Sequence, residues 1–303
     1  MSDTVSLCGL GNMGGAVAGR LAAHGPLRVF DLDPGRVAQV AEHPQVTAAG
    51  AVAELAESGV VVLSLPAPKV SLQVIAELAP RMRAGSVIVE TSTVNPADMA
   101  EELKICAAHG IGIVDAAILS GVSQMAGGTA TLLVGGEESD VDKVADVLAA
   151  ISATITRFGP VGSGMAAKVI NNAVAHAVMV VLAEAGALGA ATGVSGSALA
   201  ALLSGPEAGL TRPLTHRFVE RILRGEYDGG MPTEAARKDS ALALAMAQDT
   251  GVPLFGIQGA HTVYELGVSE GLGRLDYASI ATLWERWTGR PMTETSNDKG
   301  DEE

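Results

Sequence analysis

The chain has 303 residues, of which 48% are hydrophobic and only 3% aromatic. This length allows two domains of ordinary size, and the apolar content excludes a disordered chain. The formal net charge of -14 at pH 7 argues against a nucleic-acid partner and against docking to an anionic membrane, because both need clustered basic side chains.

The two cysteines show no spacing that is typical of a disulfide framework or a metal site. Cys8 and Cys106 fall in a predicted strand and a predicted helix, which favours small core residues. The first residues lead directly into a strand, without the charged and apolar regions of a secretory signal. We therefore expect a cytoplasmic protein with no bound metal.

A glycine-rich motif follows the first predicted strand, residues 5–8, and opens a helical pattern. In such a motif the first glycine makes a tight turn, the second lets backbone N–H groups approach a pyrophosphate, and the third lets helix and strand pack closely. The alternative is a bare strand-to-helix turn. The predicted dinucleotide-binding residues are Gly9, Leu10, Gly11, Asn12, Met13 and Gly14.

The second predicted strand, residues 27–31, ends in an acid 22 residues after Gly9. A carboxylate at this spacing accepts hydrogen bonds from the hydroxyls of the adenosine ribose, and it repels a 2′-phosphate. Asp31 therefore predicts NAD as the cofactor in preference to NADP. The alternative is that Asp31 caps a turn or helix, a role that Asp33 could also fill.

Strand and helix patterns alternate through the first half of the chain. Strands are expected at 60–65, 86–90, 111–115, 130–135 and 153–158, and helices at 70–78, 96–108 and 141–151. This order predicts an α/β Rossmann-like domain with a doubly wound parallel sheet. Ligands bind beyond the carboxyl ends of such strands, which selects Leu65, Pro66, Ser92, Thr93 and segment 115–128. Pro66 and the two hydroxyl residues could equally be turn and cap residues.

A glycine-rich break at 159–164 marks the predicted domain boundary. We expect an NAD-binding domain at 1–162 and an all-α substrate and oligomerisation domain at 163–292. A polar, acidic tail at 293–303 is expected to be disordered. Beyond a long interdomain helix, helical patterns lie at 197–203, 210–223, 233–250, 255–270 and 277–287.

The first turns of the interdomain helix contain Lys168 and Asn172, which lie about 40° apart on its surface. Residues 173–191 are almost all apolar, with only His176 and Glu184 ionisable, so we expect an interior helix that is buried almost all round and does not span a membrane. Desolvation would lower the pKa of Lys168 and suit it to acid–base catalysis. The alternative is a solvated lysine beside a polar stripe.

Four motifs occur in one order: GLGNMG at 9–14, STVNP at 92–96, GSGMAAKVINN at 162–172 and KDSALALA at 238–245. Over residues 4–291 they resemble the β-hydroxyacid dehydrogenase family, which includes 3-hydroxyisobutyrate dehydrogenase and tartronate semialdehyde reductase. The resemblance implies that Lys168 is the general acid/base and that Asn172 holds the substrate. It also implies that Leu65, Pro66 and Thr93 line the cofactor cleft, and that Lys238 reaches substrate and cofactor from the helical domain. The alternative for Lys238 is a surface charge beside its acidic neighbour.

The substrate segment departs from the family's DAPVSGG. Here Leu119 and Ser120 stand where the family has Ser and the first Gly. We expect Ser120, Gly121, Ser123 and Gln124 to bind the substrate. These residues either rebuild a site for an anion or line a more apolar pocket.

The predicted function is the NAD-dependent interconversion of a small β-hydroxy acid, similar to 3-hydroxyisobutyrate, and its semialdehyde. An imine reductase, or another reductase of the superfamily with a non-carboxylate substrate, is the alternative suggested by Leu119, although Lys168 argues against it. A non-catalytic NAD-binding module is the interpretation that the motifs favour least. We expect a small anionic substrate and a homodimer or homotetramer.

Overall fold

The structure is a computed structural model that describes residues 4–294. The chain divides into two compact units between Ala173 and Val174, and each unit is described by itself. The long helix α8 (Ser163–Thr192) begins directly after the predicted boundary, and the division falls within this helix. Of the predicted tail at 293–303, residues 295–303 lie outside the described residues.

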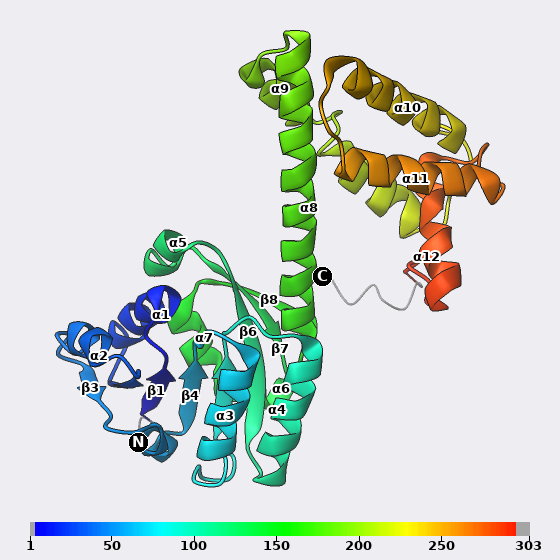
Figure 1. Ribbon diagram of the computed structural model, residues 1–303. Coiled ribbons are helices and arrows are strands. Elements are labelled where there is room, and N and C mark those ends of the chain that lie inside the picture. Colours follow the sequence, from blue (N-terminus) through cyan, green and yellow to red (C-terminus); the bar gives the residue numbers. More distant parts are fainter. Residues whose placement is uncertain (1–3, 295–303) are drawn as a thin grey trace. The chain divides into compact units, whose positions relative to one another are not determined.

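The first unit is built on a sheet of eight strands within residues 4–294, in the order β3-β2-β1-β4-β5-β6-β7-β8 (Figure 1). Neighbouring strands are parallel except β6 and β7. The predicted Rossmann-like architecture is confirmed. The strands are β1 (Val5–Cys8), β2 (Leu27–Phe30), β3 (Val46–Ala48), β4 (Val60–Leu63), β5 (Val87–Glu90), β6 (Gly112–Leu119), β7 (Thr131–Gly135) and β8 (Thr154–Gly159).

The antiparallel β6–β7 pair corrects the expectation of an entirely parallel sheet. Only residues 120–130 join the two strands, and a parallel crossover needs a dozen or more residues. The pairing uses the part of β6 that extends beyond β5, because Asp115 pairs with Glu90 on one side and with Gly135 on the other. The ends of β7 and β8 are therefore level with the carboxyl end of β5, and α8 starts there.

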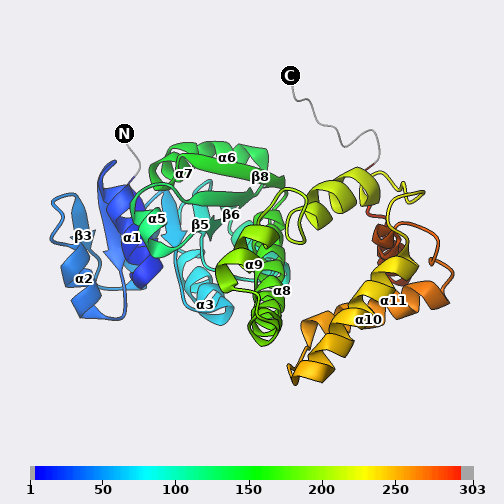
Figure 2. The same cartoon turned by 90° about the horizontal axis from the view of Figure 1, so that it is seen from above.

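Helices cover both faces of this sheet (Figure 2). One apolar core includes side chains of α1, α5, α6 and α7, and the other includes side chains of η1, α3 and α4. Cys8 and Cys106 are free thiols in the second core, as predicted. The helices are α1 (Asn12–Ala22), α2 (Pro34–Val40), η1 (Val52–Glu57), α3 (Pro68–Leu78), α4 (Pro96–Ala108), α5 (Val122–Ala126), α6 (Glu138–Lys143) and α7 (Ala145–Ile151).

The second unit is helical, as predicted. The expected helix at 210–223 is a π-helix in the structure, and the one at 277–287 consists of a 3₁₀ turn followed by an α-helix. The elements that follow α8 are α9 (Gly196–Leu203), η2 (Pro213–Ile222), α10 (Thr233–Thr250), α11 (Gly256–Ser269), η3 (Tyr277–Ile280) and α12 (Ala281–Thr288).

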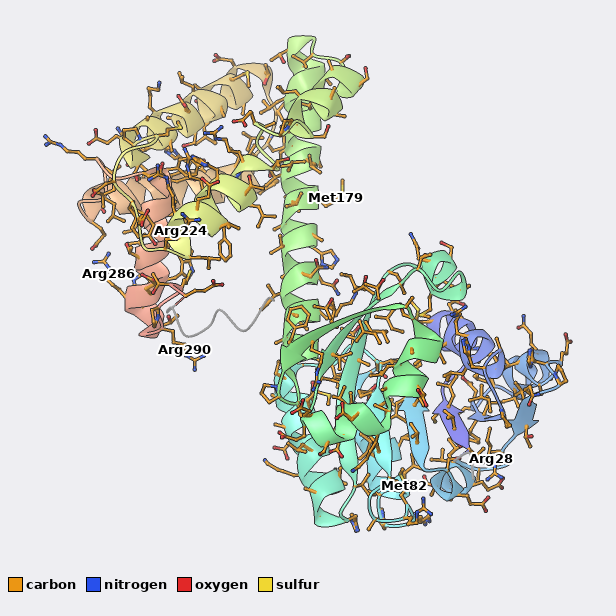
Figure 3. The ribbon with its side chains drawn as sticks, turned by 180° about the vertical axis from the view of Figure 1, so that it is seen from behind. Arg28, Met82, Met179, Arg224, Arg286 and Arg290 are labelled. Carbon is orange, nitrogen blue, oxygen red and sulfur yellow. The ribbon has the colours of Figure 1, made fainter. Side chains whose placement is uncertain are left out.

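The expectation that α8 is buried almost all round is wrong. Ile170, Val174 and Met179 are 57–63% exposed, and Met179 projects freely from the helix in Figure 3. Apolar composition shows that a surface favours burial, but it does not say that the same chain covers it. By length and composition alone α8 could also cross a membrane. The one acidic side chain of α8 is buried and hydrogen-bonded to other parts of this chain, which argues against a membrane span.

This carboxylate belongs to Glu184, which anchors the start of α11. It accepts hydrogen bonds from the backbone N–H groups of Phe255, Gly256 and Ile257 at 2.5, 2.8 and 3.0 Å. Burial would raise the pKa of Glu184, but these three hydrogen bonds outweigh it and lower the pKa. Glu184 thus caps α11 in the second unit through its charge.

Glu102 on α4 is also a buried carboxyl group, but unlike Glu184 it lacks hydrogen bonds in the described chain, and this supports a stability prediction. It is completely buried, and neither side-chain oxygen has a hydrogen-bond partner among residues 4–294. Burial, reinforced by the charge of Glu90, raises its pKa from 4.5 to about 8. Between these values the unfolded chain is ionised while the folded chain keeps the proton, so this group makes stability fall as pH rises.

We expect Glu102→Gln to raise the free energy of unfolding by roughly 1–3 kcal/mol at pH 8 and to change it little at pH 5. Chemical denaturation at the two pH values measures this. Glu101→Gln, an exposed neighbour on the same helix, is the control. An equal gain at both pH values would contradict the assignment.

Candidate functional site

The glycine-rich turn between β1 and α1 requires glycine at two positions. Gly9 has φ of +98°, and a Cβ there would lie 2.2 Å from the carbonyl oxygen of Ser64. A Cβ on Gly14 would lie 2.0 Å from the carbonyl oxygen of Gly9, whereas one on Gly11 would meet nothing within 4 Å. The first and third glycines therefore permit close packing, and the second leaves open space in front of the backbone.

Asp31 fixes this turn from the end of β2. Its carboxylate accepts hydrogen bonds from the N–H of Leu10 at 2.6 Å and from the N–H of Asp33 at 2.8 Å. Asp33 accepts from the N–H of Gly35 and caps α2. Asp31 is therefore a turn cap, as the alternative interpretation held, and not the helix cap; its contact with the adenosine ribose stays a prediction. The guanidinium of Arg36 lies 3.7 Å from Asp31 and 3.4 Å from Asp33.

A cleft of about 790 Å³ lies over this turn. Its lining contains most of the predicted cofactor residues, namely Gly9, Gly11, Asn12, Met13, Gly14, Asp31, Leu65 and Pro66. Leu10 contributes its N–H to Asp31 and buries its side chain in the core. Thr93 is exposed and is not part of this lining. The amides of Met13 and Gly14 have no acceptor within residues 4–294, and the first turn of a helix with free amides suits a pyrophosphate.

Sequence reasoning missed the apolar side of the cleft, which consists of Leu32, Val52, Val70 and Val74. Leu32 is 89% exposed, and an apolar side chain in this position suits the flat face of an adenine. The signal was an isolated leucine between Asp31 and Asp33, a position where a polar loop residue is the usual choice.

Hydrogen bonds join the segments that follow β4 and β5. The N–H of Leu65 donates to the hydroxyl of Ser92 at 2.7 Å, and the hydroxyl of Thr91 donates to the carbonyl of Leu63 at 2.6 Å. The N–H of Ser92 donates in turn to Glu90 at 2.7 Å, and complete burial raises the pKa of Glu90 to about 7. Ser92 therefore positions the backbone of the cleft wall.

Lys168 and Asn172 lie in the first three turns of α8, and both are half-buried. Burial lowers the pKa of Lys168, as predicted, and no charged group within residues 4–294 adds a resolved contribution. The strand register places the start of α8 level with the carboxyl end of β5, the edge at which ligands of such sheets bind. A half-buried amine with a lowered pKa at this edge gives up its proton more readily than an ordinary lysine, which suits it to acid–base catalysis.

The predicted substrate segment forms the end of β6 and the start of α5. The hydroxyl oxygen of Ser120 is buried and has no hydrogen-bond partner among the described residues. Gly121, Ser123 and Gln124 are exposed, and the hydroxyl of Ser123 donates to the side chain of Gln124 at 3.2 Å. Ser120 therefore offers an unused polar group.

Lys238 lies on α10 in the second unit, where its side chain is 67% exposed and pairs with Asp239 at 3.0 Å. Its predicted contact with substrate and cofactor stays a prediction. No group of His, Cys, Asp and Glu in the described chain could hold a metal ion.

The glycine turn, the carboxylate after β2 and the cleft over them define the class of protein as an NAD(P)-binding protein of Rossmann type. Residues 4–159 match the family model described as the NAD binding domain of 6-phosphogluconate dehydrogenase. Residues 162–284 match the model described as NAD-binding of NADP-dependent 3-hydroxyisobutyrate dehydrogenase. The chain belongs to the β-hydroxyacid dehydrogenase family.

Relatives of similar length span nearly the whole chain. The chain is 30% identical to 2-(hydroxymethyl)glutarate dehydrogenase of Eubacterium barkeri, covering 95% of this chain and 97% of that protein. It is 28% identical to mitochondrial 3-hydroxyisobutyrate dehydrogenase of Rattus norvegicus, covering 91% and 85%.

Two solved structures are similar to this chain over nearly its whole length. The 3-hydroxyisobutyrate dehydrogenase of Mycobacterium tuberculosis with L-serine is 28% identical, with a TM-score of 0.66 over 93% of this chain and 99% of that one. An imine reductase from Pseudomonas sp. shares the fold at 20% identity, with a TM-score of 0.82 over 94% and 100%.

Proposed function

We propose that the protein interconverts a small β-hydroxy acid, similar to 3-hydroxyisobutyrate, and its semialdehyde, with Lys168 as the general acid/base. The observation that carries this proposal is the half-buried Lys168 with a lowered pKa at the carboxyl edge of a sheet that also holds the cofactor cleft. The names of the relatives support the class of substrate.

The chemistry divides between cofactor and protein. A nicotinamide in the cleft supplies or accepts the hydride when it is bound. Lys168 takes the proton from the substrate hydroxyl during oxidation and returns it during reduction. Asn172 follows one turn later on α8 and orients the same oxygen through its amide.

The carboxylate of the substrate is assigned to the segment after β6. Ser120 has a buried hydroxyl oxygen without a partner in the described chain, and a carboxylate would accept its hydrogen bond. Ser123 and Gln124 follow shortly after in the sequence and are polar and exposed. They supply the additional hydrogen-bonding groups for the carboxylate that Leu119 cannot provide.

The alternative is an imine reductase or a related reductase with an uncharged substrate, favoured only by Leu119 in place of the family's serine. A panel of 3-hydroxyisobutyrate, 2-(hydroxymethyl)glutarate, L-serine, their semialdehydes and cyclic imines, assayed with NAD(H), separates the two. Turnover of imines alone would overturn the hydroxy-acid proposal. A panel without any turnover would revive the non-catalytic NAD-binding module.

For the cofactor we propose a preference for NAD, because the carboxylate of Asp31 repels a 2′-phosphate. We expect Asp31→Ser to lower the ratio of kcat/KM for NAD to that for NADP roughly 10- to 100-fold, since like charges brought together cost several kcal/mol. Arg36, which also pairs with Asp33 at 3.4 Å, is retained in this variant and can attract the phosphate.

Asp33→Ser is the matched control for this ratio. It removes the same charge beside Arg36 but keeps an oxygen that can cap α2. An equal shift in both variants would mean that the overall charge of the loop, and not Asp31 itself, sets the preference.

We also propose that the protein is a homodimer or homotetramer. Its substrate is a small anion, and the protein is located in the cytoplasm and has no nucleic-acid or membrane partner. The exposed apolar side chains of α8, including Val174 and Met179, support an oligomer, because a second copy would remove them from water. Sedimentation of the purified protein measures its state.

A further inference from the structure

The carboxylate of Asp115 holds the start of α8. Asp115 lies in β6 and is completely buried. One of its oxygens accepts a hydrogen bond from the N–H of Gly162 at 2.7 Å, and the other accepts from the N–H of Met165 at 2.8 Å. These N–H groups belong to the residue before α8 and to the first turn of the helix, which have no acceptor within a helix of their own.

A side-chain cap for α8 can come only from another element, because the residue before α8 has no side chain. That residue is Gly162, with φ of +92°, whereas α2 and α4 are capped locally by Asp33 and by Asn95 with Asp98. A carboxylate at a helix N-terminus is also favoured by the helix dipole. Asp115 therefore does for α8 what the local caps do for α2 and α4.

The contact between Asp115 and the start of α8 is closely packed. A Cβ on Gly164 would lie 2.3 Å from the carbonyl oxygen of Leu133 and 2.9 Å from the carboxylate of Asp115. A Cβ on Gly135 would lie 2.6 Å from the same carboxylate. Met165 is completely buried in the second apolar core. Both glycines let the first turn of α8 lie directly against β7 and against the carboxylate of Asp115.

The two elements that Asp115 joins carry the proposed general acid/base and lead into the proposed substrate-binding segment. Lys168 follows Met165 by three residues, about one turn and 4.5 Å along the helix. On the other side, β6 continues from Asp115 to Leu119, and Ser120 of the substrate segment follows directly. An error in the start of α8 would therefore displace the amine relative to the bound substrate, and displacements of about 1 Å can cost 100-fold in rate.

We propose that Asp115 is the positioning residue for Lys168, fixing the start of α8 against the strand that leads into the substrate segment. This rests on the proposed function only for its effect on turnover. The fixed helix start is also what keeps the amine half-buried. Burial raises the pKa of Asp115, and the hydrogen bonds from the N–H groups of Gly162 and Met165 oppose this rise.

The test is Asp115→Asn, which keeps the shape but turns an NH₂ group toward a backbone N–H that needs an acceptor. The control is Asp98→Asn, which removes a carboxylate from the cap of α4. We expect kcat for 3-hydroxyisobutyrate to fall at least roughly tenfold in Asp115→Asn, with KM for NAD within about twofold. Asp98→Asn should change neither.

The decisive readout does not need turnover. Acetylation of Lys168 by acetic anhydride, followed by mass spectrometry across a pH range, reports the pKa of its amine. In Asp115→Asn that pKa should rise toward its ordinary value, because a frayed helix start admits water. An unchanged labelling profile in Asp115→Asn would overturn the proposal. A wild type that turns over no substrate in the panel would sink the proposed function but not this inference.

If Asp115→Asn does not accumulate as folded protein, hydrogen exchange of the wild type supplies the test. The amides of Gly162 and Met165 should exchange at least tenfold more slowly than those of Met13 and Gly14, which lie at the start of α1 without an acceptor in the described chain. Equally fast exchange at the two helix starts would contradict a cap by Asp115.

Discussion

Lys168→Ala is expected to lower kcat about 10²- to 10⁴-fold, which is the usual value of general acid–base assistance. The dissociation constant for NADH should stay within about twofold, because Lys168 does not line the cofactor cleft. Steady-state assays give the first quantity and fluorescence titration the second. Lys104→Ala, which removes an exposed lysine paired with Glu101, controls for the loss of a positive charge.

The pH dependence identifies the role of the amine. Oxidation of the alcohol needs neutral Lys168 as the base, so its rate should rise with pH through a pKa that lies below the ordinary lysine value, the direction in which burial moves it. Lys168→Arg keeps the charge but holds its proton at every accessible pH. Near-normal turnover in Lys168→Arg would show that the charge, and not proton transfer, matters.

Much of the first unit could be predicted because its strands are buried on both faces and separated by helices with clear start signals. Helix α4 was predicted at its observed bounds, and its start carries proline and a capping box of Asn95 and Asp98. Helix α2 was missed because it has only seven residues and only two large apolar side chains, Val37 and Val40, packed partly buried against the core, which is too little for a clear apolar period. Strand β3 has only three residues, none of them fully buried.

Strand direction and helix exposure were harder to predict for a different reason. An apolar strand looks the same in either direction, and only the length of the 120–130 connection hinted that β7 runs against β6. The composition of α8 predicted burial, yet Val174 and Met179 are exposed in the single chain. Composition records a preference of the surface and not what lies against it.

The candidate site divides in the same way. The glycine turn and Asp31 could be predicted because they lie at a fixed, short separation in the sequence, and the structure places both at one cleft. The contact of Asp115 with Gly162 and Met165 joins residues about 50 positions apart. It depends on β7 returning alongside β6, so no local pattern announces it. Leu65 and Ser92 were selected by their place after strands, but the bond between them needed coordinates.

The second large effect is expected at the third glycine of the turn. In Gly14→Ala the new Cβ would lie 2.0 Å from the carbonyl oxygen of Gly9 and 3.2 Å from the side chain of Ser64. Since both neighbours belong to the cleft, the turn must move. We expect a loss of about 2–3 kcal/mol in the free energy of unfolding and at least roughly a tenfold rise in the dissociation constant for NADH.

Gly19→Ala is the matched control, since it makes the same change on the same helix. Gly19 is exposed, and a Cβ there would meet nothing within 4 Å, so we expect a gain of about 0.5–1 kcal/mol from the better helix propensity of alanine and unchanged NADH binding. Denaturant unfolding and fluorescence titration of both variants measure these effects. If Gly14→Ala bound NADH as tightly as Gly19→Ala, close contact between α1 and the turn could not be what shapes the cofactor site.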